Sequence, residues 1–179
     1  MKEKEEQAIV LDYLPYGYPL EKKMMPIAQA IGKKNLTLLE LVPRRGVSLQ
    51  VGEDAYIGEG KRDKIYYILG RLHREKLTET TKTELEEFIK KVVKEREKEF
   101  IDFFNKAEAI NKRLHQVELL PGFGKKHMQE IIKQREEKPF ESFEEMKTRI
   151  QNLPDPEKAI EKRILNELIE FERNNLFIH

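Results

Sequence analysis

Cysteine and tryptophan are absent from this chain of 179 residues. Without cysteine, the chain has no disulfide framework and no thiolate ligand for a metal ion. The four histidines do not share metal-ligand spacing, so we expect neither a metal nor another cofactor. A composition rich in Lys and Glu that lacks both Cys and Trp is typical of proteins from hyperthermophiles.

Long apolar runs are missing as well. No stretch approaches the roughly 20 apolar residues that a membrane span requires. The charged residues 1–6 are followed by no apolar segment of the signal-peptide kind. We therefore expect a soluble, cytoplasmic protein that does not use a membrane.

Recognisable catalytic motifs are lacking too. The chain contains no Gly-x-Gly-x-x-Gly, no P-loop and no serine-centred nucleophile elbow. Carboxylates are abundant but alternate with lysines along helical segments, a pattern that indicates ion pairing. We expect a protein without enzymatic activity; an enzyme built from scattered carboxylates stays as an alternative.

Charged residues make up 37% of the chain, yet the net charge is only +1. Residues 106–150 carry a small excess of positive charge and residues 151–179 an excess of negative charge. Any electropositive surface is therefore expected to be local, within residues 106–150.

The first part of the chain, residues 7–79, has the pattern of a small β domain. Short β-prone runs alternate with turns rich in Gly and Pro, at residues 8–14, 26–31, 36–42, 54–57 and 64–69. Five strands in about 70 residues predict an oligonucleotide-binding-type (OB-like) β-barrel. A small β-sandwich fits the same strand count.

The second part of the chain has helical periodicity. Thr81-Lys82-Thr83-Glu84 has the spacing of a capping box with Thr81 as the N-cap, and opens a charged connecting helix over residues 80–105. Arg96 interrupts the apolar stripe, which continues to Val117. The stripe is expected to form either one long helix or two helices in series, with Asn105 as the candidate start of the second. Further helices are expected at 127–136, at 142–151 with Ser142 and Glu145 as a capping box, and at 157–173. The fold class is thus α+β, with an all-α domain over residues 106–175.

The most informative segment is the hairpin at residues 119–126, which reads Leu-Leu-Pro-Gly-Phe-Gly-Lys-Lys. Gly122 and Gly124 allow a tight turn that exposes backbone N–H groups. The helix after the turn directs its positive N-terminal end at the same place, and Lys125 and Lys126 add charge. This combination predicts a site for a backbone phosphate; a tight turn without a ligand is the alternative.

A second, degenerate hairpin is expected at residues 152–158. Its sequence, Leu153 to Lys158, aligns with Leu120 to Lys125 at a spacing of 33 residues, so Asp155 takes the place of Gly122. Because this copy carries acids where the first has glycines, we expect it to support the first hairpin and not to bind phosphate.

The hairpin sequence, Ile131-Ile132, Arg135 and the segment 139–145 (Pro-Phe-Glu-Ser-Phe-Glu-Glu) together resemble the helix-hairpin-helix superfamily. The order of barrel, charged helix and tandem hairpins resembles one archaeal family, the domain-of-unknown-function family 655 (DUF655), described as RNA-binding. The resemblance implies sequence-independent contact with RNA or DNA backbone, and RNA as the preferred ligand. It makes ribosomal or transcription components plausible partners.

The candidate contacts lie in both parts of the chain. Tyrosines near the basic loops would stack on a single strand; only one of Tyr66 and Tyr67 can do so, since neighbouring strand residues face opposite sides. A protein-docking module in a transcription or translation assembly is the alternative function. The nucleic-acid-binding residues expected are Gly122, Phe123, Gly124, Lys125, Lys126, Lys133 and Arg135 in the helical part, and Arg44, Arg45, Lys61 and Arg62 in the β part.

Overall fold

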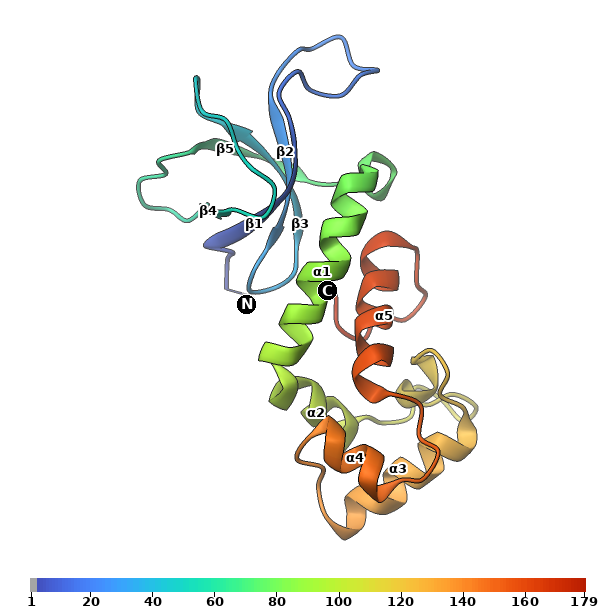
Figure 1. Ribbon diagram of the computed structural model, residues 1–179. Helices are drawn as coiled ribbons and strands as arrows, with labels where there is room; N and C mark the ends of the chain where they lie inside the picture. The colour runs from blue at the N-terminus through green and yellow to red at the C-terminus, as the bar shows by residue number, and fades with distance from the viewer. Residues whose placement is uncertain (1–2) are drawn as a thin grey trace. The chain divides into compact units, whose positions relative to one another are not determined.

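A computed structural model describes residues 3–179 and has an α+β fold with five β-strands and five α-helices (Figure 1). The chain divides into two compact units. The sheet unit comprises the residues up to Glu86 together with Leu168–His179, and the helical unit comprises Glu87–Glu167. Helices α1 and α5 each pass from one unit into the other.

All five predicted strands form, and they make one antiparallel sheet in the order β4-β1-β2-β3-β5. The central strand β2 and its neighbour β3 are buried at every residue. No pairing between the edge strands β4 and β5 occurs within residues 3–179, so the sheet is a curled, open half-barrel. The strand bounds are β1 Gln7–Leu14, β2 Ile27–Gly32, β3 Leu38–Pro43, β4 Asp54–Tyr56 and β5 Ile65–Arg71.

Helix α1, Glu79–Glu95, begins earlier than the capping pattern predicts. Thr78 is its N-cap, because the Thr78 hydroxyl accepts a hydrogen bond from the Thr81 N–H at 3.1 Å. Thr81 is instead fully buried, and its hydroxyl donates to the Gln29 side-chain oxygen at 2.6 Å. Gln29 is fully buried as well, so it needs such partners. A tertiary hydrogen bond thus overrides the local capping pattern at Thr81.

The helical stripe breaks at Arg96, as predicted, but continues differently beyond it. Two helices in series form, but the second, α2, runs over Glu97–Lys106, so its start at Asn105 is wrong. The helix expected up to Val117 is also wrong: a loop follows α2, and Gln116–Leu119 forms the 3-10 helix η2. The Asn111 side-chain oxygen accepts the N–H groups of Arg113 and Leu114 at 2.8 and 3.0 Å, which folds this loop back on itself.

Three further helices complete the chain. Ser142 caps α4 as predicted, accepting the Glu145 N–H at 3.0 Å, but the Glu145 carboxylate accepts from the Glu141 N–H and not from Ser142. The last helix ends four residues before the predicted Arg173. The bounds are α3 Lys125–Glu137, α4 Phe143–Arg149 and α5 Pro156–Ile169.

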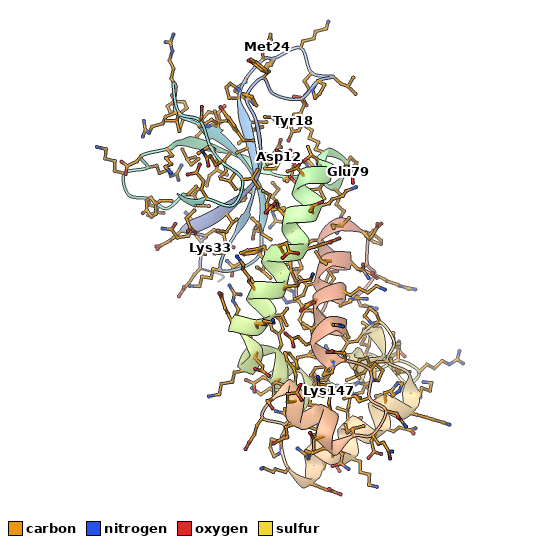
Figure 2. All side chains as sticks on the ribbon, viewed as in Figure 1. Asp12, Tyr18, Met24, Lys33, Glu79 and Lys147 are labelled. Carbon is orange, nitrogen blue, oxygen red and sulfur yellow. The ribbon has the colours of Figure 1, made fainter. Side chains whose placement is uncertain are left out.

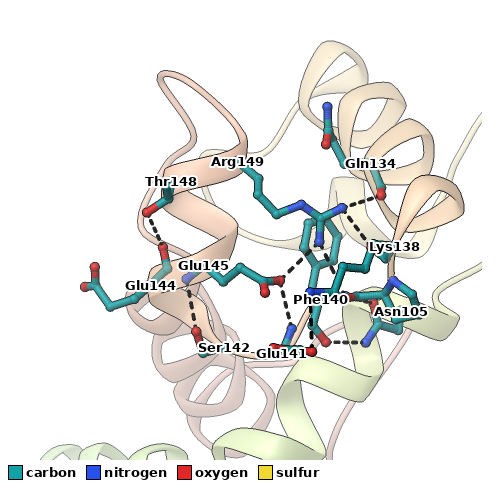
Figure 3. A network of polar contacts seen from close by, with 11 residues as sticks. Asn105, Gln134, Lys138, Phe140, Glu141, Ser142, Glu144, Glu145, Thr148 and Arg149 are labelled. Carbon is teal, nitrogen blue, oxygen red and sulfur yellow. Dashed lines mark hydrogen bonds and ion pairs between the residues drawn. The ribbon is translucent and has the colours of Figure 1, made fainter.

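An arginine holds the C-terminal end of α3 within the helical unit. Arg149 of α4 donates to the carbonyl oxygens of Gln134 and Lys138 at 2.5 and 2.8 Å, where α3 ends (Figure 3). Its guanidinium also lies 4.6 Å from the centroid of the Phe140 ring. A helix C-terminus carries unpaired carbonyls and partial negative charge, so a guanidinium stabilises it.

Candidate nucleic-acid interface

The first hairpin is a tight turn anchored by its aromatic residue. The Phe123 N–H donates to the Leu120 carbonyl at 3.1 Å, and Gly122 has a φ of +84°, which only glycine adopts readily. Phe123 is buried, with its ring centroid 6.1 Å from that of Phe104 and 5.8 Å from that of His127. The expected ligand contact by Phe123 therefore needs correction, because its side chain belongs to the core.

The open backbone donors lie just after the glycines. Gly124 is the N-cap of α3, and its own N–H donates to His127 Nδ1 at 3.0 Å. The N–H groups of Lys125, Lys126 and His127 form the first helical turn, where the helix supplies no carbonyl partner. The Gly124 N–H is therefore engaged within the turn, and the first turn of α3 adds open donors beside those predicted at the hairpin.

The two lysines of the hairpin differ in their surroundings. Lys125 donates to the Arg113 carbonyl oxygen at 2.9 Å, and its Nζ lies 3.3 Å from a Glu118 carboxylate oxygen. The backbone N–H of His115, followed by Lys125, lowers the pKa of Glu118. Lys126 is exposed and has no side-chain partner within residues 3–179. Lys125 thus positions the loop, whereas Lys126 is available to a ligand.

Two basic residues that the sequence analysis did not select lie beside the hairpin. The Lys125–Arg113 bond brings the loop containing Lys112 and Arg113 next to the start of α3. Both side chains are exposed, and neither pairs with an acid in the described part of the chain. The adjacent Lys-Arg pair was the available sequence signal, but the expected helix concealed its position. We call Lys112, Arg113, Lys125 and Lys126 the hairpin basic cluster.

The other two candidates on α3 have different environments. Lys133 is exposed and lies two turns after Lys126, on the same side of the helix. Arg135 instead donates through one nitrogen to the carbonyl oxygens of Phe104 and Ala107, at 3.0 and 2.7 Å. It caps the C-terminal end of α2, and we therefore assign it to the scaffold.

The second hairpin packs against the first. A Cβ placed on Gly122 would lie 3.7 Å from Cβ of Pro154. The side chain of Asp155 accepts the Lys158 N–H at 3.2 Å and so caps its own helix, α5. Asp155 directly precedes α5, as Gly124 directly precedes α3. The structure therefore aligns Asp155 with Gly124, whereas the sequence alignment pairs it with Gly122. A carboxylate in the capping position opposes phosphate binding there.

His115 is the N-cap of the 3-10 helix η2, and its titration is expected to make the stability of residues 115–120 depend on pH. His115 Nδ1 accepts the Val117 N–H at 3.1 Å, which requires an unprotonated nitrogen. Burial, followed by the charge of Arg135, lowers the pKa of His115, and these effects outweigh the opposing effects of Glu118 and Glu108. The stabilisation from neutral His115 is complete above the unfolded-state pKa of about 6.5. It declines as the pH falls below that value and is lost below the folded-state pKa.

We therefore expect amide hydrogen exchange in residues 115–120 to accelerate, after correction for intrinsic rates, between pH 7.5 and pH 5.5. His115→Asn keeps a capping acceptor but cannot titrate, so its protection should change little over this range. Glu118 titrates only at lower pH, since its pKa is lowered. Equal acceleration of hydrogen exchange in the unchanged chain and in His115→Asn would show that His115 does not cause the pH dependence.

The candidates of the sheet unit gather around two loops. Arg62 Nε donates to the Gly58 carbonyl oxygen at 2.8 Å, and Arg44 Nε donates to the Arg62 carbonyl oxygen at 2.6 Å. Both side chains thereby hold the loop between β4 and β5. Lys61 and Arg45 are exposed and make no hydrogen bond or ion pair with residues 3–179.

A pocket of about 490 Å³ opens between these elements of the sheet unit. Tyr66 is 64% exposed, whereas the Tyr67 hydroxyl contacts the Met25 sulfur at 3.7 Å. The structure thus brings Arg44, Arg45 and Tyr66 together in the pocket lining, to which Lys61 and Arg62 do not belong. The lining comprises Tyr13, Pro26, Pro43, Arg44, Arg45, Gly46, Val47, Ser48 and Tyr66.

Neither a metal site nor a membrane helix is found in the part of the chain that the structure describes. Residues 3–179 contain no group of three or more His, Asp or Glu side chains that could hold a metal ion. No helix in the same range has the length and apolarity to cross a bilayer.

The chain is similar to archaeal proteins over nearly its whole length. The family model described as protein of unknown function (DUF655) matches residues 4–179. Uncharacterized protein MJ0038 of Methanocaldococcus jannaschii is 43% identical over 174 residues, which cover 97% of this chain and 79% of that protein. The crystal structure of Af1531 from Archaeoglobus fulgidus is 44% identical, with a TM-score of 0.82; the match covers 98% of this chain and 100% of that one.

Proposed function

The chain belongs to the DUF655 family of proteins of unknown function, and we propose that it is a non-enzymatic protein that binds the phosphate backbone of RNA. The first hairpin makes the contact with the phosphate backbone. The N–H groups at the start of α3 hydrogen-bond to one phosphate, and the hairpin basic cluster neutralises that phosphate and its neighbours.

One observation carries this proposal: unpaired cations gather at the open N-terminus of α3. Several lysines elsewhere in this nearly neutral chain pair with acids, as in Lys138–Glu141 at 3.6 Å and Lys147–Glu144 at 2.9 Å. Lys112, Arg113 and Lys126 have no acid partner among residues 3–179. Lys112 and Arg113 are neighbours in the chain, and an anionic ligand at the start of α3 would neutralise their charges together with that of Lys126.

The arrangement of the two hairpins supports interpreting the helical unit as a tandem helix-hairpin-helix module. Each hairpin precedes an α-helix, α3 or α5, and Pro154 packs beside Gly122. The 3-10 helix η2 stands where such a module has its first helix. The five-stranded, curled sheet is compatible with an opened OB-like barrel, which we include in the proposal.

Such contacts select for phosphate and not for base sequence. Phosphate is common to RNA and DNA, so the preference for RNA follows from the resemblance and not from a residue. We propose a cytoplasmic setting because the sequence shows neither a signal-like segment nor a long apolar run. Ribosomal or transcription complexes, which hold RNA in large amounts, are the partners we propose.

A titration of the full chain against structured RNA, single-stranded RNA and duplex DNA at several salt concentrations tests the function. Three or four phosphate contacts predict a slope of roughly −2 to −4 for log affinity against log salt. Structured RNA should bind with similar affinity whatever its sequence. Weak binding that does not respond to salt would reject the proposal.

A second candidate function rests on the loop between β1 and β2. Three of its apolar side chains are strongly exposed: Tyr16 at 72%, Leu20 at 99% and Met24 at 74%, the last labelled in Figure 2. Exposed apolar side chains of one loop favour a protein-docking surface where they form a contiguous patch. If docking is the function, Leu20→Ser with Met24→Ser would abolish capture of a partner while the salt titration shows no RNA binding.

A further inference from the structure

The pocket of the sheet unit has the composition of a site for an aromatic anion. Its volume of about 490 Å³ lies within the range of sites that hold small molecules. Tyr66 and Tyr13 offer aromatic surface, and Pro26 and Pro43 form rigid apolar walls. Within residues 3–179, its lining includes two arginines and neither Asp nor Glu.

The backbone fixes where the positive charge is presented. The Val47 N–H donates to the Arg44 carbonyl oxygen at 3.0 Å, closing a turn with Arg45 and Gly46 at its centre. Gly46 has a φ of +81°, which suits the third position of such a turn. Arg45 therefore lies at the tip of the turn, at the rim of the pocket. Its guanidinium has no partner in the described chain.

The aromatic surface is equally available. Tyr66 is 64% exposed, and the neighbouring ring of Tyr67 supports it edge-on with centroids 5.3 Å apart. The hydroxyl of Tyr13 donates to the Val47 carbonyl oxygen at 3.5 Å, which joins β1 to the turn. A flat ring entering the pocket would meet Tyr66 without displacing a buried side chain.

We propose that this pocket holds one unpaired nucleotide of a single strand, with its base stacked on Tyr66 and its phosphate paired with Arg45. The inference rests on the proposed function and adds a second kind of contact to it. Stacking needs a base but tolerates any base, because every base has a π-face. The hairpin, by contrast, needs only phosphate.

This difference allows the two sites to be tested apart. A single-stranded RNA of about eight nucleotides is compared with the same strand made of abasic units, which keeps the phosphates and removes the bases. The intact chain should bind the base-bearing strand roughly tenfold or more tightly than the abasic strand. Fluorescence anisotropy of an end-labelled strand measures both.

Variants of two pocket residues complete the design. Tyr66→Ala should remove the preference for the base-bearing strand while leaving the abasic strand unaffected. Arg45→Gln should weaken the binding of both strands by a similar factor, roughly five- to tenfold, because it removes a phosphate contact. Tyr16→Ala is the matched control, since Tyr16 is 72% exposed and lies outside the pocket lining.

Equal affinity of the intact chain for the two strands would overturn the inference, as would equal behaviour of Tyr66→Ala and Tyr16→Ala. An acidic aromatic peptide that competes with the strand for the pocket more strongly than a mononucleotide does would also overturn it. Salt-dependent binding of the abasic strand would survive all of these outcomes if the hairpin function is correct. Failure of the pocket and failure of the hairpin are therefore distinguishable.

Discussion

Changing Gly124 to Asp together with Lys126 to Glu is expected to weaken RNA binding about 100-fold. The pair places two carboxylates where the N–H groups and the free lysine face a phosphate. Like charges brought together at an interface cost several kcal/mol, and each ~1.4 kcal/mol is about tenfold in affinity. Filter binding at fixed salt measures the loss, and the magnitude of the salt slope should fall as well.

The double variant should remain folded. A Cβ on Gly124 would meet nothing closer than His127 Nδ1 at 4.0 Å, and Asp is a favourable N-cap residue. Lys126 has no partner in residues 3–179. Lys125, the other lysine of the hairpin, is unsuitable, because its contacts with Arg113 and Glu118 hold the loop.

Two control variants separate local charge from shape and from overall charge. Gly124→Asn with Lys126→Gln keeps the shapes without adding a carboxylate, and should lose only a few-fold in affinity. Lys91→Glu with Lys98→Gln makes the same change of net charge on exposed residues of α1 and α2, and should have a small effect. If this last variant weakens binding as much as the hairpin variant, the hairpin is not the site.

Arg163→Met is expected to reduce the free energy of unfolding of the helical unit by about 3–5 kcal/mol. Arg163 is 5% exposed and Glu167 is 1% exposed, and Arg163 Nε lies 2.8 Å from the Glu167 carboxylate. A second nitrogen of Arg163 donates to the Leu119 carbonyl oxygen at 3.3 Å, where η2 ends. Removing the guanidinium takes the Arg163 charge away from the buried Glu167 carboxylate, and this accounts for most of the expected loss of stability.

Urea titration followed by circular dichroism measures this loss. Arg163→Met with Glu167→Leu removes both charges and should recover much of the stability. Some loss of stability should remain, because the Leu119 carbonyl oxygen still lacks the hydrogen bond that Arg163 donates. Lys147→Met breaks the exposed pair with Glu144 and should have little effect on stability. A loss from Arg163→Met no larger than that from Lys147→Met would show that the buried pair is unimportant.

The strands were predictable because each is a short, β-prone run between turns rich in Gly and Pro. The helix break at Arg96 and the N-cap at Ser142 were also predictable, because each depends on residues within one helical turn. Thr81 and the segment after α2 were not. The buried side chain of Gln29 recruits Thr81, and Asn111 closes a loop on residues that have helical spacing.

The amino-acid sequence by itself determined the fold class, the number of strands and the tight turn at Gly122, because these depend on backbone preferences of neighbouring residues. Only the tertiary structure decided which basic residues are available. Arg135, Arg149 and Arg163 look like surface cations in the sequence, yet each donates to carbonyl oxygens of an element distant in the chain or at the end of another helix. Lys112 and Arg113 reach the hairpin only because the loop folds back. The partner of a long charged side chain is set by three-dimensional proximity, which sequence spacing does not encode.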